Sequence, residues 1–278
     1  MLYHIIAASE DRIALSFCSG LLLNDRYRLT ECLYQDGGIH QIWRAIDLQL
    51  QTPVVVKALD FGALHNAERR RVMQHEYNLM TQAAHLYVAQ VYELMPGEDR
   101  FYFVMESFQA DLLTFLGVHP SNPSWLLDAM IQVLGALEHG HALGMTHRDV
   151  KPRNIFVNFD GKNFTAKLGD FESAVCFDDR GNPAHSTDDL WFRGTPYYMS
   201  PEKLELYCMG ALLGSYRMRF SMEAASDLYA VASVLKELSA SQVFPPQFDE
   251  ILRKAIEEDP GKRYATAAEF GRALQALL

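Results

Sequence analysis

Apolar residues are spaced in two different ways along the chain. Between residues 27 and 108 they gather in short runs rich in β-branched and aromatic side chains, and polar or glycine-containing turns separate the runs. Such runs are typical of β-strands. In residues 66–84, by contrast, apolar side chains recur at helical spacing. The pattern predicts a mainly β part with one helix, and it places strands at 27–33, 41–46, 53–59 and 101–108.

Beyond residue 122 the apolar residues recur mostly at helical spacing. Asn122 followed by Pro123 is typical of a helix start, because the Asn side chain accepts a hydrogen bond from the first turn and proline fits there. Ser226 is expected to cap a further helix in the same way. In the last helix, Phe270, Leu274 and Leu277 recur at helical spacing. The core face expected of the helix after Asn122 consists of Leu127, Met130, Ile131, Leu134 and Leu137.

The first 26 residues are harder to assign. Leu2–Ala7 and Arg12–Cys18 are able to pair as a hairpin across the polar turn Ser9–Asp11. We therefore expect residues 1–26 to form an N-terminal extension, a hairpin that covers the edge of the strands that follow. A dimer contact or the docking site of a regulatory partner is the alternative.

The composition excludes several classes of protein. The chain has 278 residues, 49% of them hydrophobic, which is enough to build one large domain or two lobes around a substantial core. Its net charge of −10 gives no support to a nucleic acid or an anionic membrane as a partner. The scattered cysteines argue against a disulfide framework or a zinc site and fit reduced cytosolic thiols. They are Cys18, Cys32, Cys176 and Cys208.

The location of the protein can be inferred from two further features. Residues 1–8 are apolar but lack a basic start, and the charged residues 10–12 follow directly, which makes a poor signal peptide. No apolar run approaches the roughly 18 residues that a membrane-spanning helix needs. We expect a cytoplasmic protein without a membrane partner, and secretion as an effector is the alternative.

The candidate chemistry lies in the stretch Met145–Phe156 and in one residue beyond it. The stretch holds Asp149, Lys151 and Asn154, and Asp170 follows downstream. Phosphoryl transfer requires these parts: an acceptor for the hydroxyl proton, a cation on the moving phosphate, and oxygen ligands for magnesium. The alternative is a loop that is merely polar, and the number of positions that match in spacing argues against it.

Two motifs carry a resemblance to a known family. His147-Arg-Asp-x-Lys-Pro-x-Asn154, followed by Asp170-Phe171, resembles the catalytic and magnesium loops of eukaryotic-like (Hanks-type) Ser/Thr protein kinases of bacterial build. Gly194–Glu202 resembles the end of the kinase activation segment. The resemblance implies an α+β, bilobal protein kinase fold, with a small, mainly antiparallel β lobe containing one helix and a larger, mainly helical lobe. It implies an N-lobe at 27–107 and a C-lobe at 108–278.

The resemblance also implies roles for the candidate residues. Asp149 would be the general base, or would orient the substrate hydroxyl, and Lys151 would lie on the γ-phosphate of ATP. Asn154 and Asp170 would hold Mg²⁺, with Mn²⁺ as the alternative ion.

The nucleotide itself would contact residues from both lobes. Lys57 would grip the α- and β-phosphates and pair with Glu76. Met105 would be the gatekeeper beside adenine, the backbone of Glu106 and Phe108 would hydrogen-bond the base, and Phe156 would contact its lower face. The other residues expected around ATP are Gly37 and Gly38 in the glycine-rich turn, and Ile42 and Val55 in strands.

The chain departs from the family pattern at two places. In the glycine-rich loop, Gln35 and His40 stand where the family has glycine, so the lid over the phosphates should be bulkier. Glu172 replaces the glycine of Asp-Phe-Gly. Because glycine permits backbone angles that other residues resist, we expect Glu172 to restrict Phe171 to one of its two family positions.

Further residues are expected to support the site. Arg148 is typical of kinases whose activation loop is steadied by a phosphate, and Asp227 would anchor the backbone of the catalytic loop. Glu202 and Arg263 should form a buried ion pair. Thr195 would bond to Asp149 and Lys151. The candidate phosphosites are Ser186, Thr187 and Thr195, and Asp188 and Asp189 are alternative sources of negative charge near Arg148, unless this loop is simply solvated.

Together these features predict an ATP-dependent protein kinase that transfers the γ-phosphate to Ser and Thr hydroxyls of protein substrates and autophosphorylates. The alternative is a pseudokinase, a nucleotide-binding regulatory or scaffold module, which Gln35, His40 and Glu172 favour. Lys57 and Asp149 stand against it, together with the other matching residues Glu76, Asn154 and Asp170, because a scaffold has no chemical need for all five. A regulatory partner or self-association stays open.

Overall fold

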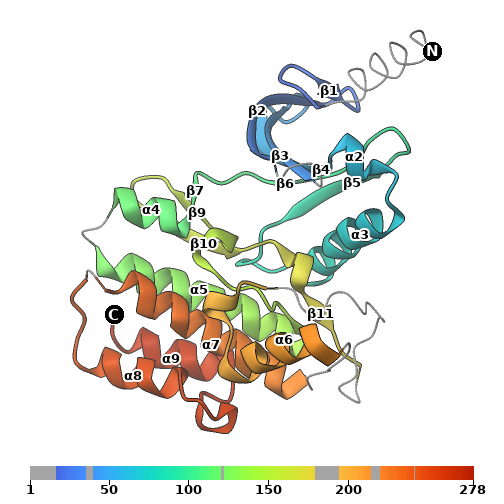
Figure 1. The fold of residues 1–278 in the computed structure, drawn as a ribbon. Coiled ribbons are helices and arrows are strands. Elements are labelled where there is room, and N and C mark those ends of the chain that lie inside the picture. Colours follow the sequence, from blue (N-terminus) through green and yellow to red (C-terminus); the bar gives the residue numbers. More distant parts are fainter. Residues whose placement is uncertain (1–16, 36–39, 120–121, 179–193, 214–219, 241) are drawn as a thin grey trace. The chain divides into compact units, whose positions relative to one another are not determined.

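The computed structural model describes residues 17–35, 40–119, 122–178, 194–213, 220–240 and 242–278 (Figure 1). The chain divides into two compact units. The first comprises Met1–Thr81 and Gln90–Ser107, and the second comprises Gln82–Ala89 and Phe108–Leu278. The hairpin expected from residues 2–7 and 12–18 falls almost entirely in residues 1–16, which lie outside the described residues, as does the turn expected at 36–39.

The first unit is built on an antiparallel six-stranded sheet of order β1-β2-β3-β4-β6-β5. Buried and half-buried positions alternate along β3, as expected of a strand with one face in a core. The strands are β1 (Leu22–Leu23), β2 (Tyr27–Gln35), β3 (His40–Asp47), β4 (Thr52–Leu59), β5 (Val91–Pro96) and β6 (Phe101–Glu106). All four predicted strands are confirmed, whereas β1 and β5 were not predicted.

Two helices accompany this sheet, α2 (Phe61–Leu64) and α3 (Ala67–Gln82). The Asn66 side chain accepts hydrogen bonds from the backbone N–H groups of Glu68 and Arg69, which explains why α3 begins there. The helix predicted over 66–84 is confirmed. Its buried side consists of Val72, Met73, Glu76, Leu79 and Met80, so it includes one carboxylate among apolar residues.

The second unit is mainly helical. Its helices are α4 (Leu112–Val118), α5 (Pro123–Ala142), α6 (Pro201–Leu213), α7 (Phe220–Leu238), α8 (Gln247–Ala255) and α9 (Ala267–Gln275). The central helix α5 contacts α7, α9 and β10 (Phe164–Leu168). Asn122 accepts a hydrogen bond from Ser124 N, so the predicted cap of α5 is confirmed. Among the described residues, no helix has both the length and the apolar character needed to cross a membrane.

Short strands in the second unit frame the candidate chemistry. A three-stranded antiparallel sheet has the order β10-β9-β7, with β7 at Ala110–Asp111 and β9 at Ile155–Phe159. A second pair joins β8 (Met145–Thr146) to β11 (Val175–Cys176). The stretch that carries Asp149 lies between β8 and β9, and Asp170 follows β10.

The division of the chain differs in one segment from the lobe boundaries expected at 27–107 and 108–278. Residues 82–89 belong to the second unit. Backbone hydrogen bonds explain this, because Leu168 N donates to Tyr87 O and Ala89 N donates to Leu168 O. The segment is thereby tied to the end of β10.

The prediction that Ser226 caps a helix is wrong. Helix α7 already begins at Phe220, so Ser226 lies inside it and is buried. Its hydroxyl forms a hydrogen bond with Ser200 instead of with a helix N-terminus. The tertiary contact to Ser200 could not be read from the local sequence, in which a serine before a helical pattern normally indicates a cap.

The glycine that follows α5 gives a test of the fold. Gly144 has a φ of +70°, and an added Cβ would lie 2.9 Å from the carbonyl oxygen of Phe177. We expect Gly144→Ala to lower the free energy of unfolding by about 1–3 kcal/mol, because a left-handed backbone strains any L side chain. The matched control is Gly117→Ala in α4, where a Cβ meets nothing within 4 Å. Chemical denaturation followed by circular dichroism should find the control no less stable than wild type.

Candidate functional site

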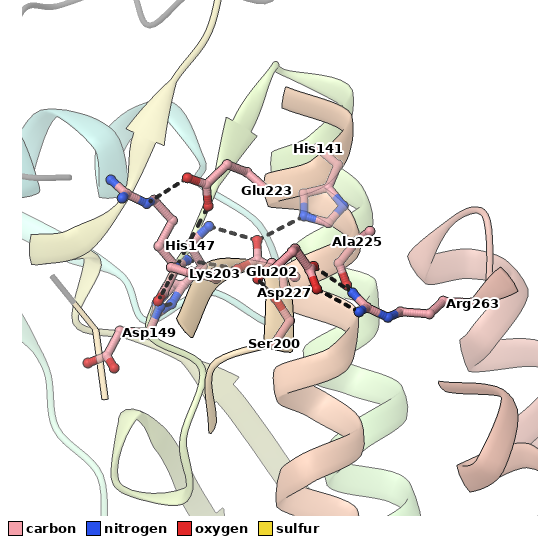
Figure 2. A network of polar contacts seen from close by, with 12 residues as sticks. His141, His147, Asp149, Ser200, Glu202, Lys203, Glu223, Ala225, Asp227 and Arg263 are labelled. Atoms are coloured by element: carbon pink, nitrogen blue, oxygen red, sulfur yellow. Dashed lines mark hydrogen bonds and ion pairs between the residues drawn. The ribbon is translucent and has the colours of Figure 1, made fainter. Parts of the chain in front are cut away.

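A buried carboxylate on α7 fixes the backbone of the candidate loop. Asp227 is 1% exposed and accepts hydrogen bonds from His147 N at 2.9 Å and Arg148 N at 2.8 Å. His141 Nε2 lies 3.0 Å from the same carboxylate (Figure 2). Burial alone would raise the pKa of Asp227, but the hydrogen bond with His141 and the charge of neighbours such as Lys203 outweigh it and hold the pKa below its ordinary value. The expected anchoring role of Asp227 thus has a direct structural basis.

These hydrogen bonds stabilise an unusual backbone conformation. Arg148 has a φ of 71°, in the left-handed region that side chains other than glycine rarely adopt. Such strain costs about 1–3 kcal/mol and persists only where the surroundings over-determine it. Asp227 supplies part of that constraint by accepting from two consecutive backbone N–H groups, those of His147 and Arg148.

His147 packs behind the loop. Its Nδ1 accepts a hydrogen bond from Asp149 N, so the ring proton lies on Nε2, which donates to Gly169 O at 3.0 Å. Burial lowers the pKa of His147, in keeping with a neutral ring. The ring also meets Phe171 edge-on at 4.8 Å. His147 therefore connects the Asp149 loop to the Asp170 segment and acts through packing.

Asp149 is held by three side chains. Lys151 Nζ donates to Asp149 Oδ2 at 2.6 Å, and Thr195 Oγ1 donates to Asp149 Oδ1 at 2.8 Å. Lys151 Nζ also reaches Thr195 Oγ1 at 3.2 Å, and Asn154 Nδ2 donates to Asp149 Oδ2 at 3.2 Å. The contacts expected of Thr195 are confirmed. A phosphate on Thr195 would break both of its hydrogen bonds, so its expected role as a phosphosite competes with this arrangement.

Asn154 and Asp170 come from neighbouring segments. Gly169 N donates to Asn154 O at 2.9 Å, which aligns the two stretches, and Asp170 follows with a φ of 60°. The amide group of Asn154 directs its N–H to Asp149 O at 2.9 Å as well as to the carboxylate, so its side-chain oxygen points elsewhere. A carboxylate with an amide oxygen is a donor set that suits a hard divalent cation such as Mg²⁺.

Gly169 has a role that the sequence analysis missed. An added Cβ would lie 2.5 Å from Cε2 of Phe156. Phe156 in turn stacks on Phe108, with ring centroids 5.3 Å apart. The lack of a side chain at 169 therefore lets the Phe156 ring lie against the backbone that leads into Asp170. A glycine directly before Asp-Phe was the available signal.

Glu172 is accommodated without left-handed geometry. It lies in the 3₁₀ turn Phe171–Ser173. Among the described residues, the positive φ of this segment falls on Asp170 and not on Glu172. Phe171 is 4% exposed beneath His147. That Glu172 restricts Phe171 to one position stays a prediction.

In the first unit, the predicted ion pair between Lys57 and Glu76 is confirmed. Lys57 Nζ lies 2.8 Å from each carboxylate oxygen of Glu76, and the two residues are 5% and 1% exposed. Burial of two charges is tolerated only where they pair well. The pair links β4 to α3.

The sheet register groups the expected nucleotide contacts around Lys57. Residues two apart on a strand share a face, so Val55 lies on the same face of β4 as Lys57. Ile42 is opposite Lys57 on β3, and Met105 is opposite Val55 on β6. Glu106 N donates to Gln90 O at 2.8 Å, so this N–H group is already used. The carbonyl oxygen of Glu106 is then the backbone group left for the expected contact with adenine.

Other predicted residues lie outside the described part of the chain. Gly37 and Gly38 belong to the undescribed turn 36–39, although Gln35 and His40 at its ends are in β2 and β3. Ser186 and Thr187, with Asp188 and Asp189, fall in 179–193.

The predicted ion pair between Glu202 and Arg263 is confirmed in a bidentate geometry. Arg263 Nη1 and Nη2 each lie 2.8 Å from a carboxylate oxygen of Glu202 (Figure 2). The Arg263 side chain is completely buried. The sequence analysis missed three residues that contact the loop or its anchor. His141 contacts Asp227, and Lys203 and Glu223 both contact Arg148. An acidic residue one helical turn before Asp227 was the signal for the last of these.

The comparison with known families decides the identity of this site. The protein kinase domain family matches residues 36–265.

The chain belongs to the protein kinase family. The bilobal α+β fold expected from the sequence is confirmed, because the first unit is an antiparallel sheet with helix α3 and the second unit of the kinase is mainly helical.

Similar curated proteins are bacterial serine/threonine-protein kinases. PrkC of Bacillus subtilis is 27% identical over 275 residues, which cover 90% of this kinase and 40% of PrkC. PknL of Mycobacterium tuberculosis is also 27% identical over 275 residues, covering 92% of this chain and 66% of PknL. PknB of Mycolicibacterium smegmatis is 29% identical over 272 residues, covering 89% and 42%. The chain spans about 40–66% of the length of these relatives.

The Glu202–Arg263 pair of this kinase allows a test of stability. We expect Glu202→Gln to lower the free energy of unfolding by about 3–5 kcal/mol, because it leaves a buried guanidinium without its charged partner. Glu31→Gln is the matched control, since Glu31 pairs with Arg44 at the surface, with 60% of its side chain exposed. Surface pairs contribute about 0–1 kcal/mol. Urea denaturation of both variants would contradict this expectation if their losses were equal.

The same variant should change the pH dependence of stability. Burial raises the pKa of Glu202, but the hydrogen bonds from Arg263 and Ser200 outweigh it and hold the pKa below its ordinary value of 4.5. A carboxyl with a lowered folded pKa contributes stability above its unfolded pKa and loses it as the pH falls. The difference between wild type and Glu202→Gln should therefore shrink below a pH of about 4.5.

Proposed function

We propose that this chain is an ATP-dependent protein kinase that transfers the γ-phosphate of ATP to Ser and Thr hydroxyls and phosphorylates itself. The observation that carries the proposal is the Asp149 carboxylate, which Lys151, Thr195 and Asn154 hold in one orientation. A carboxylate fixed beside a lysine is the arrangement that phosphoryl transfer to a hydroxyl requires.

In the proposed reaction, Asp149 orients the incoming hydroxyl and accepts its proton. Lys151 contacts the γ-phosphate and offsets the negative charge that develops during transfer. Thr195 keeps both side chains in register through its two hydrogen bonds. Lysine and threonine at these positions are also what the family uses for Ser/Thr substrates, which supports that specificity.

Asn154 and Asp170 would hold Mg²⁺, or Mn²⁺ as the alternative, through their side-chain oxygens. When bound, the ion neutralises charge on the phosphates of ATP. Lys57 would hold the α- and β-phosphates, kept in place by Glu76. The adenine ring would contact Met105, the carbonyl of Glu106, and the Phe108–Phe156 stack. Gly37, Gly38, Ile42 and Val55 complete the proposed nucleotide contacts.

The relatives named serine/threonine-protein kinases support a protein substrate. The net charge of −10 gives no reason to propose a nucleic acid as the partner. We place the reaction in the cytoplasm, with Ser186 and Thr187 as the sites of autophosphorylation. A regulatory partner or self-association through residues 1–26 is compatible with this proposal.

A pseudokinase is the second candidate function. Gln35 and His40 at the ends of the glycine-rich turn, and Glu172 after Phe171, are the observations that favour it. The paired state of Lys57 and the three-sided support of Asp149 favour catalysis instead. A scaffold gains nothing from a carboxylate held this way.

A transfer assay separates the two candidates. The purified chain is incubated with magnesium and γ-labelled ATP, with and without a basic generic protein. We expect label on Ser or Thr, and we expect Asp149→Asn and Asp170→Asn each to reduce the rate by about 10²-fold or more, because proton acceptance and ion binding are lost. The matched control is Asp249→Asn on the exposed side of α8, which should keep the wild-type rate.

Two results would contradict the proposal of a kinase. Label that persists at the wild-type rate in both active-site variants would point to a contaminating enzyme. Nucleotide-dependent thermal stabilisation without any transfer would favour the pseudokinase.

A further inference from the structure

A second carboxylate lies one helical turn before Asp227 on the same helix. Glu223 and Asp227 are four residues apart on α7, so their side chains lie on one face. Both are 1% exposed. Two carboxylates at this spacing repel each other, and burying them is costly unless cations lie close by. The cations that surround them therefore indicate what Glu223 does.

Arg148 is the first of these cations. Its Nε lies 3.3 Å from Glu223 Oε1, and both side chains are 1% exposed. Arg148 directly precedes Asp149, which is the proposed catalytic carboxylate. The ion pair thus connects α7 to the side chain of the residue next to the reacting group.

Lys203 at the start of α6 is the second cation. Its Nζ lies 3.7 Å from Glu223 Oε2 and donates a hydrogen bond to Arg148 O at 2.9 Å (Figure 2). Burial lowers the pKa of Lys203, whereas the negative charge of Glu223 raises it. Glu223 therefore contacts both the guanidinium of Arg148 and the ammonium group of Lys203, which itself binds the backbone of Arg148.

Within the described part of the chain, at least three contacts hold Arg148. Asp227 accepts from its backbone N–H, Lys203 donates to its carbonyl oxygen, and Glu223 pairs with its guanidinium. These three contacts are all made by Arg148, the residue with the strained φ of 71°. Two of the three contacts come from one helix, so the loop is positioned by a rigid element of the fold.

In kinases with an arginine next to the catalytic carboxylate, a phosphate on the activation segment commonly pairs with arginine. The phosphate supplies the anion that orders the activation segment. Here Glu223 supplies a buried anion from α7. We propose that Glu223 is a positioning residue, which sets the Asp149 loop through Arg148 and makes its geometry independent of phosphorylation. This inference rests on the proposed kinase function.

The first test uses the wild-type chain in two forms. One is treated with a protein phosphatase until intact mass shows no phosphate, and the phosphatase is then removed. Initial rates with ATP and a Ser/Thr peptide are compared before autophosphorylation accumulates. We expect the two forms to differ by less than about threefold and to show no lag. A larger loss on dephosphorylation would overturn the inference, and this test needs no variant to fold.

The second test asks whether Glu223 acts on the chemical step. We expect Glu223→Gln to lower kcat by roughly 10- to 100-fold, because a small displacement of a catalytic group is costly. KM for ATP should stay near the wild-type value. Partial unfolding would also leave KM unchanged, but it would lower the apparent kcat only in proportion to the folded fraction. The folded fraction is therefore measured by thermal denaturation. The charge-preserving Glu223→Asp should recover part of kcat, and Glu205→Gln on the exposed side of α6 is the matched control.

Hydrogen exchange separates this inference from the proposed function. Peptides covering residues 146–154 should exchange slowly in the dephosphorylated wild type and faster in Glu223→Gln, while peptides from β4 stay unchanged. That result without any phosphoryl transfer would keep the positioning role and reject the kinase function. Equal exchange in both proteins, or an unchanged kcat in the variant, would overturn the role assigned to Glu223.

Discussion

The buried carboxylate of Asp227 is the constraint on which the candidate site depends. It accepts hydrogen bonds from the backbone of His147 and Arg148 and thereby fixes a loop that would otherwise relax from its left-handed conformation. Because Asp227 sits in the middle of α7, the loop takes its position from a helix packed into the core of the second unit. Ordering of the loop is thus coupled to the folding of that unit.

Electrostatic pairing extends this constraint outward. Glu202 with Arg263, and Glu223 with Arg148 and Lys203, place several charges in the interior of the second unit. Buried pairs add little net stability compared with apolar residues, but removing one partner is expensive. Such pairs therefore specify one arrangement of the chain more than they strengthen it. The same principle applies to Lys57 and Glu76 in the first unit, where the pair sets the position of β4 against α3.

Uncharged residues determine how the segments of the described site pack. Gly169 leaves room for the Phe156 ring, which stacks on Phe108, and the ring of His147 bridges to Gly169 and Phe171. These contacts hold the segment before Asp170 close to Asn154. Of the departures from the family pattern, Gln35 and His40 lie in β2 and β3 of the first unit, and Glu172 fits its turn with an ordinary backbone.

The sequence by itself determined the family resemblance, the strands β2, β3, β4 and β6, the helices α3 and α5, and the pairs Lys57–Glu76 and Glu202–Arg263, because motif spacing and apolar periodicity are local signals. It could not place Ser226, which looks like a helix cap but lies within α7, because the contact to Ser200 joins residues distant in the chain. Nor could it find Glu223 and Lys203 as partners of Arg148. Only the packing of α6 and α7 around the loop brings these charges together, and burial then decides that they must pair.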